Sequence, residues 1–145
     1  MVNSDARAGF VGYWLPVLLW MALIMVGTSL PRPPHLGVES GDKLAHLVAY
    51  GVLGVLLMRA FRFAAACPWW QAALASVLFG TAYGVLDEVH QAFLPSRTCS
   101  VEDLVADVMG LIAAALVTWV IGCRIGRSEV REQMKIRDRG DDVHV

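Results

Sequence analysis

The chain has 145 residues, 57% of them hydrophobic, and a formal net charge of −1. That length suits a single domain, and the hydrophobic content lies above the roughly 45–50% that is usual for soluble domains. The near-neutral charge gives no support for a nucleic-acid partner. Three scattered cysteines without a CxxC pair argue against a disulfide framework and against a zinc site. The composition therefore points to a membrane protein.

Four long apolar stretches predict the fold class, an all-α polytopic membrane bundle of four transmembrane helices. Their expected bounds are about residues 13–30, 43–61, 69–86 and 101–123. The first stretch carries Pro16 in its first turn and ends at a proline-rich connector over residues 31–41. A cleaved signal peptide is the alternative for this stretch, because small residues lie near its end.

The second and third stretches differ in length and in packing surface. The wholly apolar part of the second, residues 44–58, would span only about 22 Å at 1.5 Å per residue, which is short for a bilayer. The third contains Gly80 and Gly84, a small-xxx-small surface that allows close approach of another helix.

Sequence patterns mark both the start of the fourth stretch and the boundary between it and the tail. Ser100 and Asp103 resemble a capping box, which predicts that the fourth helix begins at Val101. The chain then divides into a membrane domain, residues 1–123, and a charged tail, residues 124–145, expected as a frayed or surface-lying helix.

Positive side chains distinguish the two sides of the predicted membrane domain. With four spans, both termini and the turn between the second and third spans share one side. That side carries nine Lys or Arg residues and the other side carries three. The positive-inside rule then places both termini in the cytoplasm and the polar residues described next on the outer side.

Polar side chains concentrate at this outward end of the predicted bundle. Asp42, His46 and Tyr50 are spaced i, i+4, i+8 and share one helix face, and two further helices carry acids at the same end. Because ionisable groups inside a membrane are costly, they are expected to meet inside the bundle, with Arg97 as counter-ion for the acids. The predicted polar pocket comprises Asp42, Lys43, His46, Tyr50, Asp87, Glu88, Gln91, Arg97, Asp103 and Asp107.

Several roles are open for this pocket. It could bind an anionic or glycosylated envelope lipid, or support hydrolysis or group transfer with His46 or an acid as general base. The charges could also serve only to hold the helices together, with the acids near the loop simply solvated. A metal site of His46, His90, Asp87 and Asp107, or a haem between the two histidines, lacks matched ligand spacing, so no metal and no other cofactor is expected.

The order of these polar residues resembles the VanZ-like family. The first motif reads Asp42-Lys43-x-x-His46-x-x-x-Tyr50-x-x-Leu53, and the second reads Asp87-Glu88-x-x-Gln91-x-x-x-Pro95-x-Arg97-x-x-Ser100-x-x-Asp103-x-x-x-Asp107-x-x-Gly110. The resemblance covers about residues 13 to 122. The chain departs from the family pattern at Asp107, where the family usually has Asn.

The resemblance implies a small multi-pass protein of the bacterial cytoplasmic (inner) membrane, in a family whose namesake is linked to low-level resistance to the antibiotic teicoplanin. We therefore expect an integral membrane protein that contacts membrane lipids and recognises a cell-envelope lipid, glycan or lipoglycopeptide, such as a lipid-linked cell-wall precursor. An envelope hydrolase or transferase using an acid with His46, and a structural or assembly protein, are the alternatives. The resemblance supplies no reaction, so enzyme activity is not predicted.

Overall fold

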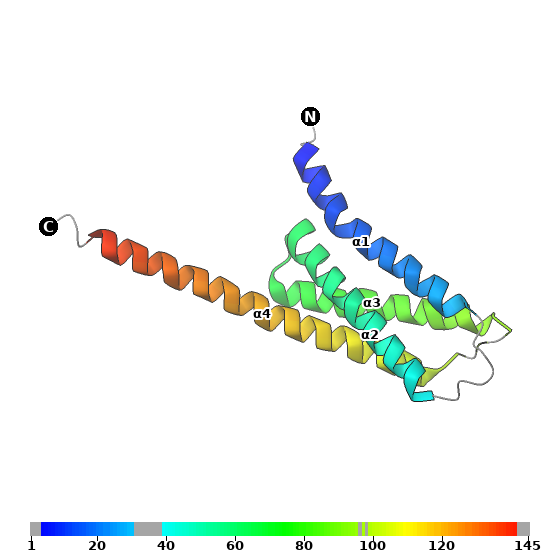
Figure 1. The fold of residues 1–145 in the computed structure, drawn as a ribbon. Helices are drawn as coiled ribbons and strands as arrows, with labels where there is room; N and C mark the ends of the chain where they lie inside the picture. Colours follow the sequence, from blue (N-terminus) through cyan, green and yellow to red (C-terminus); the bar gives the residue numbers. More distant parts are fainter. Residues whose placement is uncertain (1–3, 31–38, 96, 98, 142–145) are drawn as a thin grey trace.

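The computed structural model describes residues 4–30, 39–95, 97 and 99–141. These residues form four helices and no strand: α1 (Ser4–Ser29), α2 (Glu39–Arg59), α3 (Trp69–Ala92) and α4 (Val101–Asp141), with a π-helical turn, η1 (Ala60–Ala64), that continues α2 (Figure 1). Each helix contains a segment long and apolar enough to cross a membrane: Gly9–Ser29, Gly41–Ala64, Trp69–Ala92 and Val101–Ser128. The predicted all-α bundle with four membrane helices is confirmed.

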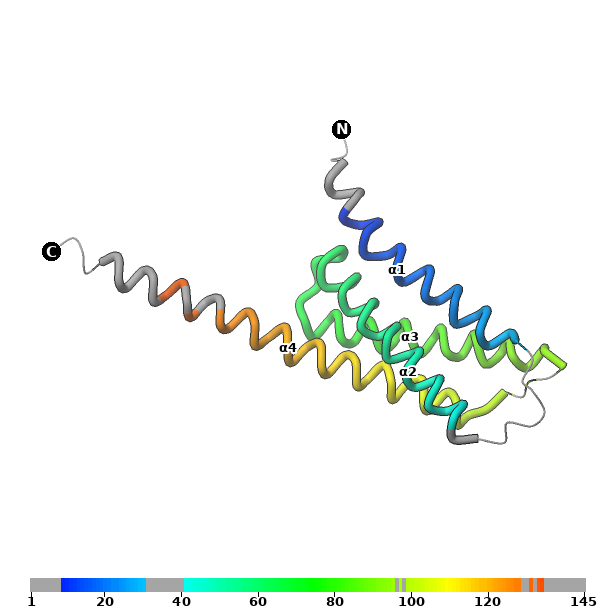
Figure 2. The backbone as a smooth tube through the Cα atoms, viewed as in Figure 1, coloured from blue at the N-terminus to red at the C-terminus, as the bar shows by residue number. Residues whose placement is uncertain are grey.

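The helices alternate in direction, so their ends gather in two groups. The end of α1, the start of α2, the end of α3 and the start of α4 lie at one end of the bundle (Figure 1). The end of α2 and the start of α3 lie at the other end, and α4 continues beyond the bundle there (Figure 2). Residues from all four helices are thereby brought together at the first end.

Glycines set the spacing between α4 and the helices beside it. A Cβ atom on Gly110 of α4 would collide with the backbone oxygen of Leu47 and lie 2.9 Å from the backbone nitrogen of Gly51, both on α2. A Cβ atom on Gly80 of α3 would collide with the side chain of Leu111. The close approach predicted for the small-xxx-small surface of α3 is therefore found against α4.

The bundle interior is apolar away from its polar end. Leu53, Leu57 and Leu111 are fully buried there. Large apolar side chains also cover the outside of the bundle, as a lipid environment requires and as a soluble monomer rarely shows. Exposed members of this outer layer include Leu18, Leu19, Leu23, Val26, Leu74, Leu78, Leu86, Leu116 and Ile121.

The helices are longer than the apolar stretches predicted. α1 begins at Ser4, so Pro16 lies inside the helix and the prediction of a first-turn position was wrong. The second span reaches Ala64 through η1 and has 24 residues, about 36 Å at 1.5 Å per residue, which removes the shortfall inferred from its apolar core. Of the predicted connector at residues 31–41, residues 31–38 lie outside the described part.

α3 and α4 also extend past their predicted ends. α3 continues to Ala92 because its polar residues face the bundle interior and do not interrupt the helix. The backbone of α4 continues as one helix to Asp141, beyond the predicted end at residue 123. The chain after residue 123 contains no proline and many Arg, Glu, Gln and Lys residues, which are good helix formers.

Candidate functional site

The polar residues of the sequence lie on the helix turns that meet at one end of the bundle. Because α3 continues through them, Asp87 and Glu88 are helical and buried, with 0% and 3% of their surface exposed. Asp103, in the first turn of α4, is 5% exposed. The interpretation of these acids as solvated loop residues was therefore wrong, although it holds for the exposed Glu102.

The centre of the polar end is a contact between His46 of α2 and Asp107 of α4. Nδ1 of His46 lies 3.0 Å from Oδ1 of Asp107, and the two residues are 5% and 0% exposed. Gly110, one turn further along α4, allows the two backbones to approach closely enough for this contact. The carboxylate fixes the orientation of the imidazole ring, as a hydrogen-bonded acid does beside many functional histidines.

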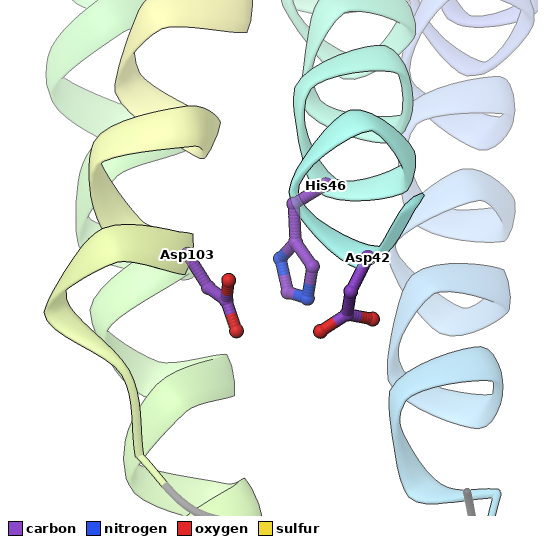
Figure 3. Close-up of side chains that lie close together, drawn as sticks. All are labelled: Asp42, His46 and Asp103. Carbon is purple, nitrogen blue, oxygen red and sulfur yellow. The ribbon is translucent and has the colours of Figure 1, made fainter. Parts of the chain in front are cut away.

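Two further carboxylates flank the same imidazole. Asp42 comes from the first turns of α2 and Asp103 from the first turn of α4, and the His46 ring lies between them (Figure 3). One ring nitrogen and one oxygen from each carboxylate all lie within 4.8 Å of one another. The i, i+4 spacing of Asp42 with His46, and of Asp103 with Asp107, places each pair on one helix face.

Asp87 joins α3 to α1. Its Oδ1 atom accepts a hydrogen bond of 2.7 Å from Oγ1 of Thr28, in the last turn of α1. Its Oδ2 atom lies 3.3 Å from the donating Nε2 of Gln91, one turn along α3. Two donors therefore serve this fully buried carboxylate, which offsets part of its desolvation cost.

Glu88 connects α3 to the start of α4. Its Oε2 atom accepts a hydrogen bond of 2.7 Å from the backbone nitrogen of Ser100. The hydroxyl of Ser100 in turn accepts from the backbone nitrogen of Asp103 at 3.3 Å, which is the hydrogen bond of a helix N-cap. The predicted start of the fourth helix at Val101 is confirmed.

Buried polar atoms at this end that have no hydrogen-bond partner among the described residues include the Tyr50 hydroxyl, Oε1 of Glu88 and Oδ2 of Asp107. Tyr50 is fully buried, and its ring stacks on His46 with 6.4 Å between ring centroids and 9° between planes. An unpartnered buried polar group costs about 1–3 kcal/mol. Several such atoms together are typical of a site that another molecule or ion completes.

The two cations predicted in the pocket lie at its edges. Nη2 of Arg97 donates to the backbone oxygen of Leu30, at 2.9 Å, just beyond α1. This position suits a cation, since the carbonyl end of a helix carries partial negative charge. Lys43 forms an ion pair with Glu102 in a neighbouring groove between α2 and α4, where the Glu102 side chain is largely exposed and the Lys43 side chain is partly exposed.

A cavity of about 310 Å³ lies beside the polar cluster, between α1 and α2. Its wall is mostly apolar, with Trp20, Leu23 and Ile24 of α1 facing Ala49 of α2. Its polar lining includes four members of the predicted pocket, which are Asp42, His46, Tyr50 and Arg97. Of the other six, the five buried residues Asp87, Glu88, Gln91, Asp103 and Asp107 are not among the cavity lining, and Lys43 lies in the neighbouring groove.

The contribution of α1 to this end of the bundle was not predicted from the sequence. Thr28 bonds Asp87, the neighbouring Ser29 hydroxyl lies 3.1 Å from Nε2 of His90, and Trp20 donates to the backbone oxygen of Ala49 at 2.9 Å. The adjacent hydroxyls at the end of an apolar stretch were the available signal, but small residues there also fit a signal-peptide cleavage site.

The fold and this site define a class: a polytopic helical membrane protein in which acids and an imidazole are buried at one end of the bundle. The sequence model of the VanZ/LLP1 family matches residues 10–122, a range that includes every member of the polar cluster. The chain therefore belongs to the VanZ/LLP1 family, which confirms the resemblance seen in its motifs. Searches of curated proteins and of solved structures gave no significant match.

Proposed function

We propose that the protein recognises an amphipathic cell-envelope molecule, a lipid or lipid-linked glycan, in the cavity between α1 and α2. The observation that carries this proposal is the composition of the cavity. An apolar wall from both helices leads to Asp42, His46 and Arg97 at the polar end. Such a cavity suits a molecule with a hydrocarbon part and a polar part, because apolar walls with a few convergent polar groups are the usual form of a ligand site.

The polar end suits an anionic, hydroxyl-bearing headgroup. The guanidinium of Arg97 can hold a phosphate through charge-assisted hydrogen bonds. The carboxylate of Asp42 can accept hydrogen bonds from sugar hydroxyls, and His46 can donate or accept one according to its tautomer. A volume of about 310 Å³ is at the small end for ligand pockets, so the cavity would take the junction between headgroup and chain.

Positive charge supports a cavity that faces the outside of the cell. The termini and the η1 turn share one side of the four-span bundle, and that side carries nine of the twelve cations of the sequence. The proposed orientation in the bacterial inner membrane, with both termini cytoplasmic, places the cavity near the outer leaflet. Envelope precursors and lipoglycopeptides such as teicoplanin are present on that side, and the latter are a second ligand class to test.

Binding can be tested with Arg97→Gln and Lys43→Gln as matched variants, each lacking one cation near the same membrane end. Purified protein in detergent is mixed with labelled phosphate-bearing envelope lipids, and retained lipid is measured. A hydrogen bond to a charged group contributes about 1.5–3 kcal/mol, so Arg97→Gln should weaken binding by about 10–100-fold. Lys43→Gln should bind as the wild-type protein does, since Lys43 lies in the neighbouring groove.

Melting temperatures of both variants show whether a loss of binding reflects unfolding. The proposal fails if the folded wild-type protein retains no lipid class above the level of an unrelated membrane protein. It also fails if both folded variants lose binding equally, because the effect would then follow charge and not the cavity.

The contact between His46 and Asp107 favours a second candidate function, an envelope hydrolase or transferase. A buried carboxylate that orients an imidazole is the arrangement used for general base catalysis. In that case His46 would take a proton from water or from an acceptor hydroxyl at the cavity. The same lipid incubation separates the two functions, because an enzyme yields a new product and a binding protein releases intact lipid.

A further inference from the structure

The polar end of the bundle buries more acids than bases among the described residues. Asp87, Glu88, Asp103 and Asp107 are each at most 5% exposed, and His46 is the one buried side chain there that can carry positive charge. Thr28 and Gln91 serve Asp87, but they are neutral donors. Several carboxylates packed together in a dry site require either protonation or a cation to balance their charge.

Three of these side chains converge on one point from three helices. A ring nitrogen of His46, an oxygen of Glu88 and an oxygen of Asp107 all lie within 4.8 Å of one another. Oε1 of Glu88 and Oδ2 of Asp107 are buried and have no hydrogen-bond partner among the described residues. The unsatisfied acceptors thus belong to the same residues that converge.

We propose that His46, Glu88 and Asp107 bind a divalent metal ion. Ligand atoms about 2.0–2.2 Å from an ion lie roughly 3–4.4 Å from one another, so separations within 4.8 Å need only small side-chain movements. The 3.0 Å distance between Nδ1 of His46 and Oδ1 of Asp107 suits two ligands of one ion once no proton lies between them. Binding through Nδ1 leaves the imidazole proton on Nε2.

The surroundings of the imidazole support that protonation state. The carboxylates of Asp42 and Asp103 flank the ring and provide acceptors for an Nε2 proton (Figure 3). A metal-bound histidine usually donates its other ring proton to a carboxylate, which fixes the tautomer and strengthens the ligand. Asp42 and Asp103 would therefore hold the imidazole, while the ion itself lies on the side of Glu88 and Asp107.

The ligand types indicate the class of ion. One imidazole with two carboxylates suits Zn²⁺ or Mn²⁺ better than Mg²⁺ or Ca²⁺, which prefer oxygen ligands alone. Three protein ligands also leave at least one coordination position for water or another molecule. The ligands come from separate helices, so no short sequence motif announces them, and this inference stands independently of lipid binding in the cavity.

The test is a titration of purified, chelator-treated protein in detergent with Zn²⁺, followed by calorimetry, and with Mn²⁺, followed by its electron paramagnetic resonance signal. The expected result is one ion per chain. Glu88→Gln and Asp107→Asn should each weaken binding by more than about 100-fold, because loss of an outer partner alone costs 10–100-fold. Glu102→Gln, which removes an exposed acid from the same turn of α4 as Asp103, should bind as the wild-type protein does.

Circular dichroism and melting curves identify any variant that fails to fold. Glu88→Asp keeps a carboxylate and should therefore retain part of the affinity for the metal ion. Absence of saturable binding to the wild-type protein overturns the proposal, as does unchanged binding by folded Glu88→Gln. Loss of binding in Asp42→Asn but not in Glu88→Gln also overturns it. Lipid retention measured on the same samples, with and without chelator, reports separately on the proposed function.

Discussion

The contact between His46 and Asp107 depends on how closely α2 and α4 approach, and Gly110→Ala tests that dependence. A Cβ atom at this position would collide with the backbone oxygen of Leu47 and lie 2.9 Å from the backbone nitrogen of Gly51. Ordinary contacts begin near 3.4 Å, so the second distance is about 0.5 Å too short. Both neighbours are backbone atoms, and only a separation of the two helices relieves them.

The expected cost follows from two opposing effects. Overpacking costs about 1–3 kcal/mol, and replacing glycine by alanine in a helix returns up to about 1 kcal/mol. Gly110→Ala should therefore lower the free energy of unfolding by up to about 3 kcal/mol. Gly51→Ala is the matched control, because its Cβ atom would meet nothing nearer than 3.8 Å, and it should be neutral or stabilising by up to about 1 kcal/mol.

Reversible unfolding in mixed detergent micelles measures both variants against the wild-type protein. The separation forced by Gly110→Ala should also lengthen the His46–Asp107 distance one turn away, which a loss of metal or lipid binding would report. Equal stability of Gly110→Ala and Gly51→Ala would refute the close approach of α2 and α4 described here.

Two further predictions follow from single contacts, and a third follows from the proposed orientation. Tyr83→Phe should destabilise the fold by about 1 kcal/mol, because the Tyr83 hydroxyl donates at 2.6 Å to a carbonyl of α1. Tyr50→Phe should cause no such loss, because the Tyr50 hydroxyl has no partner among the described residues. Equal losses of stability in thermal unfolding would contradict this prediction. Thr28→Val should lower the stability by about 1.5–3 kcal/mol in the same assay, since it removes a hydrogen bond to the buried carboxylate of α3. An unchanged stability would mean that this hydrogen bond does not hold α1 against α3. In intact cells a membrane-impermeant maleimide should label Cys99 and not Cys67, and the reverse pattern would invert the proposed orientation.

The membrane fold was largely predictable because bilayer thickness imposes a minimum length on each apolar stretch. Helix ends were less predictable, since hydropathy falls wherever a polar residue appears, even one that faces the bundle interior. Asp87 and Glu88 illustrate this: they end the apolar run but not the helix. The cap at Ser100 was predictable because its signal is local, a hydroxyl that accepts from the backbone nitrogen of Asp103.

The candidate site was predictable only in part. Helical spacing placed Asp42, His46 and Tyr50 on one face, and the cost of burying charge implied that acids from other helices would join them. Periodicity within one helix carries no information about pairing between helices. The contacts of His46 with Asp107, and of Thr28 with the acid on α3, therefore required the structure.

The central claim is that acids and an imidazole from separate helices are in direct, buried contact at one end of the bundle. A double-mutant cycle on His46→Ala and Asp107→Ala, read out as the free energy of unfolding, tests it most directly. The solvent-accessible pair of Lys43 and Glu102, which joins the same two helices, is the control and should show coupling close to zero. We expect a coupling of at least about 1 kcal/mol between His46 and Asp107, and additive effects of the two substitutions would contradict the direct contact.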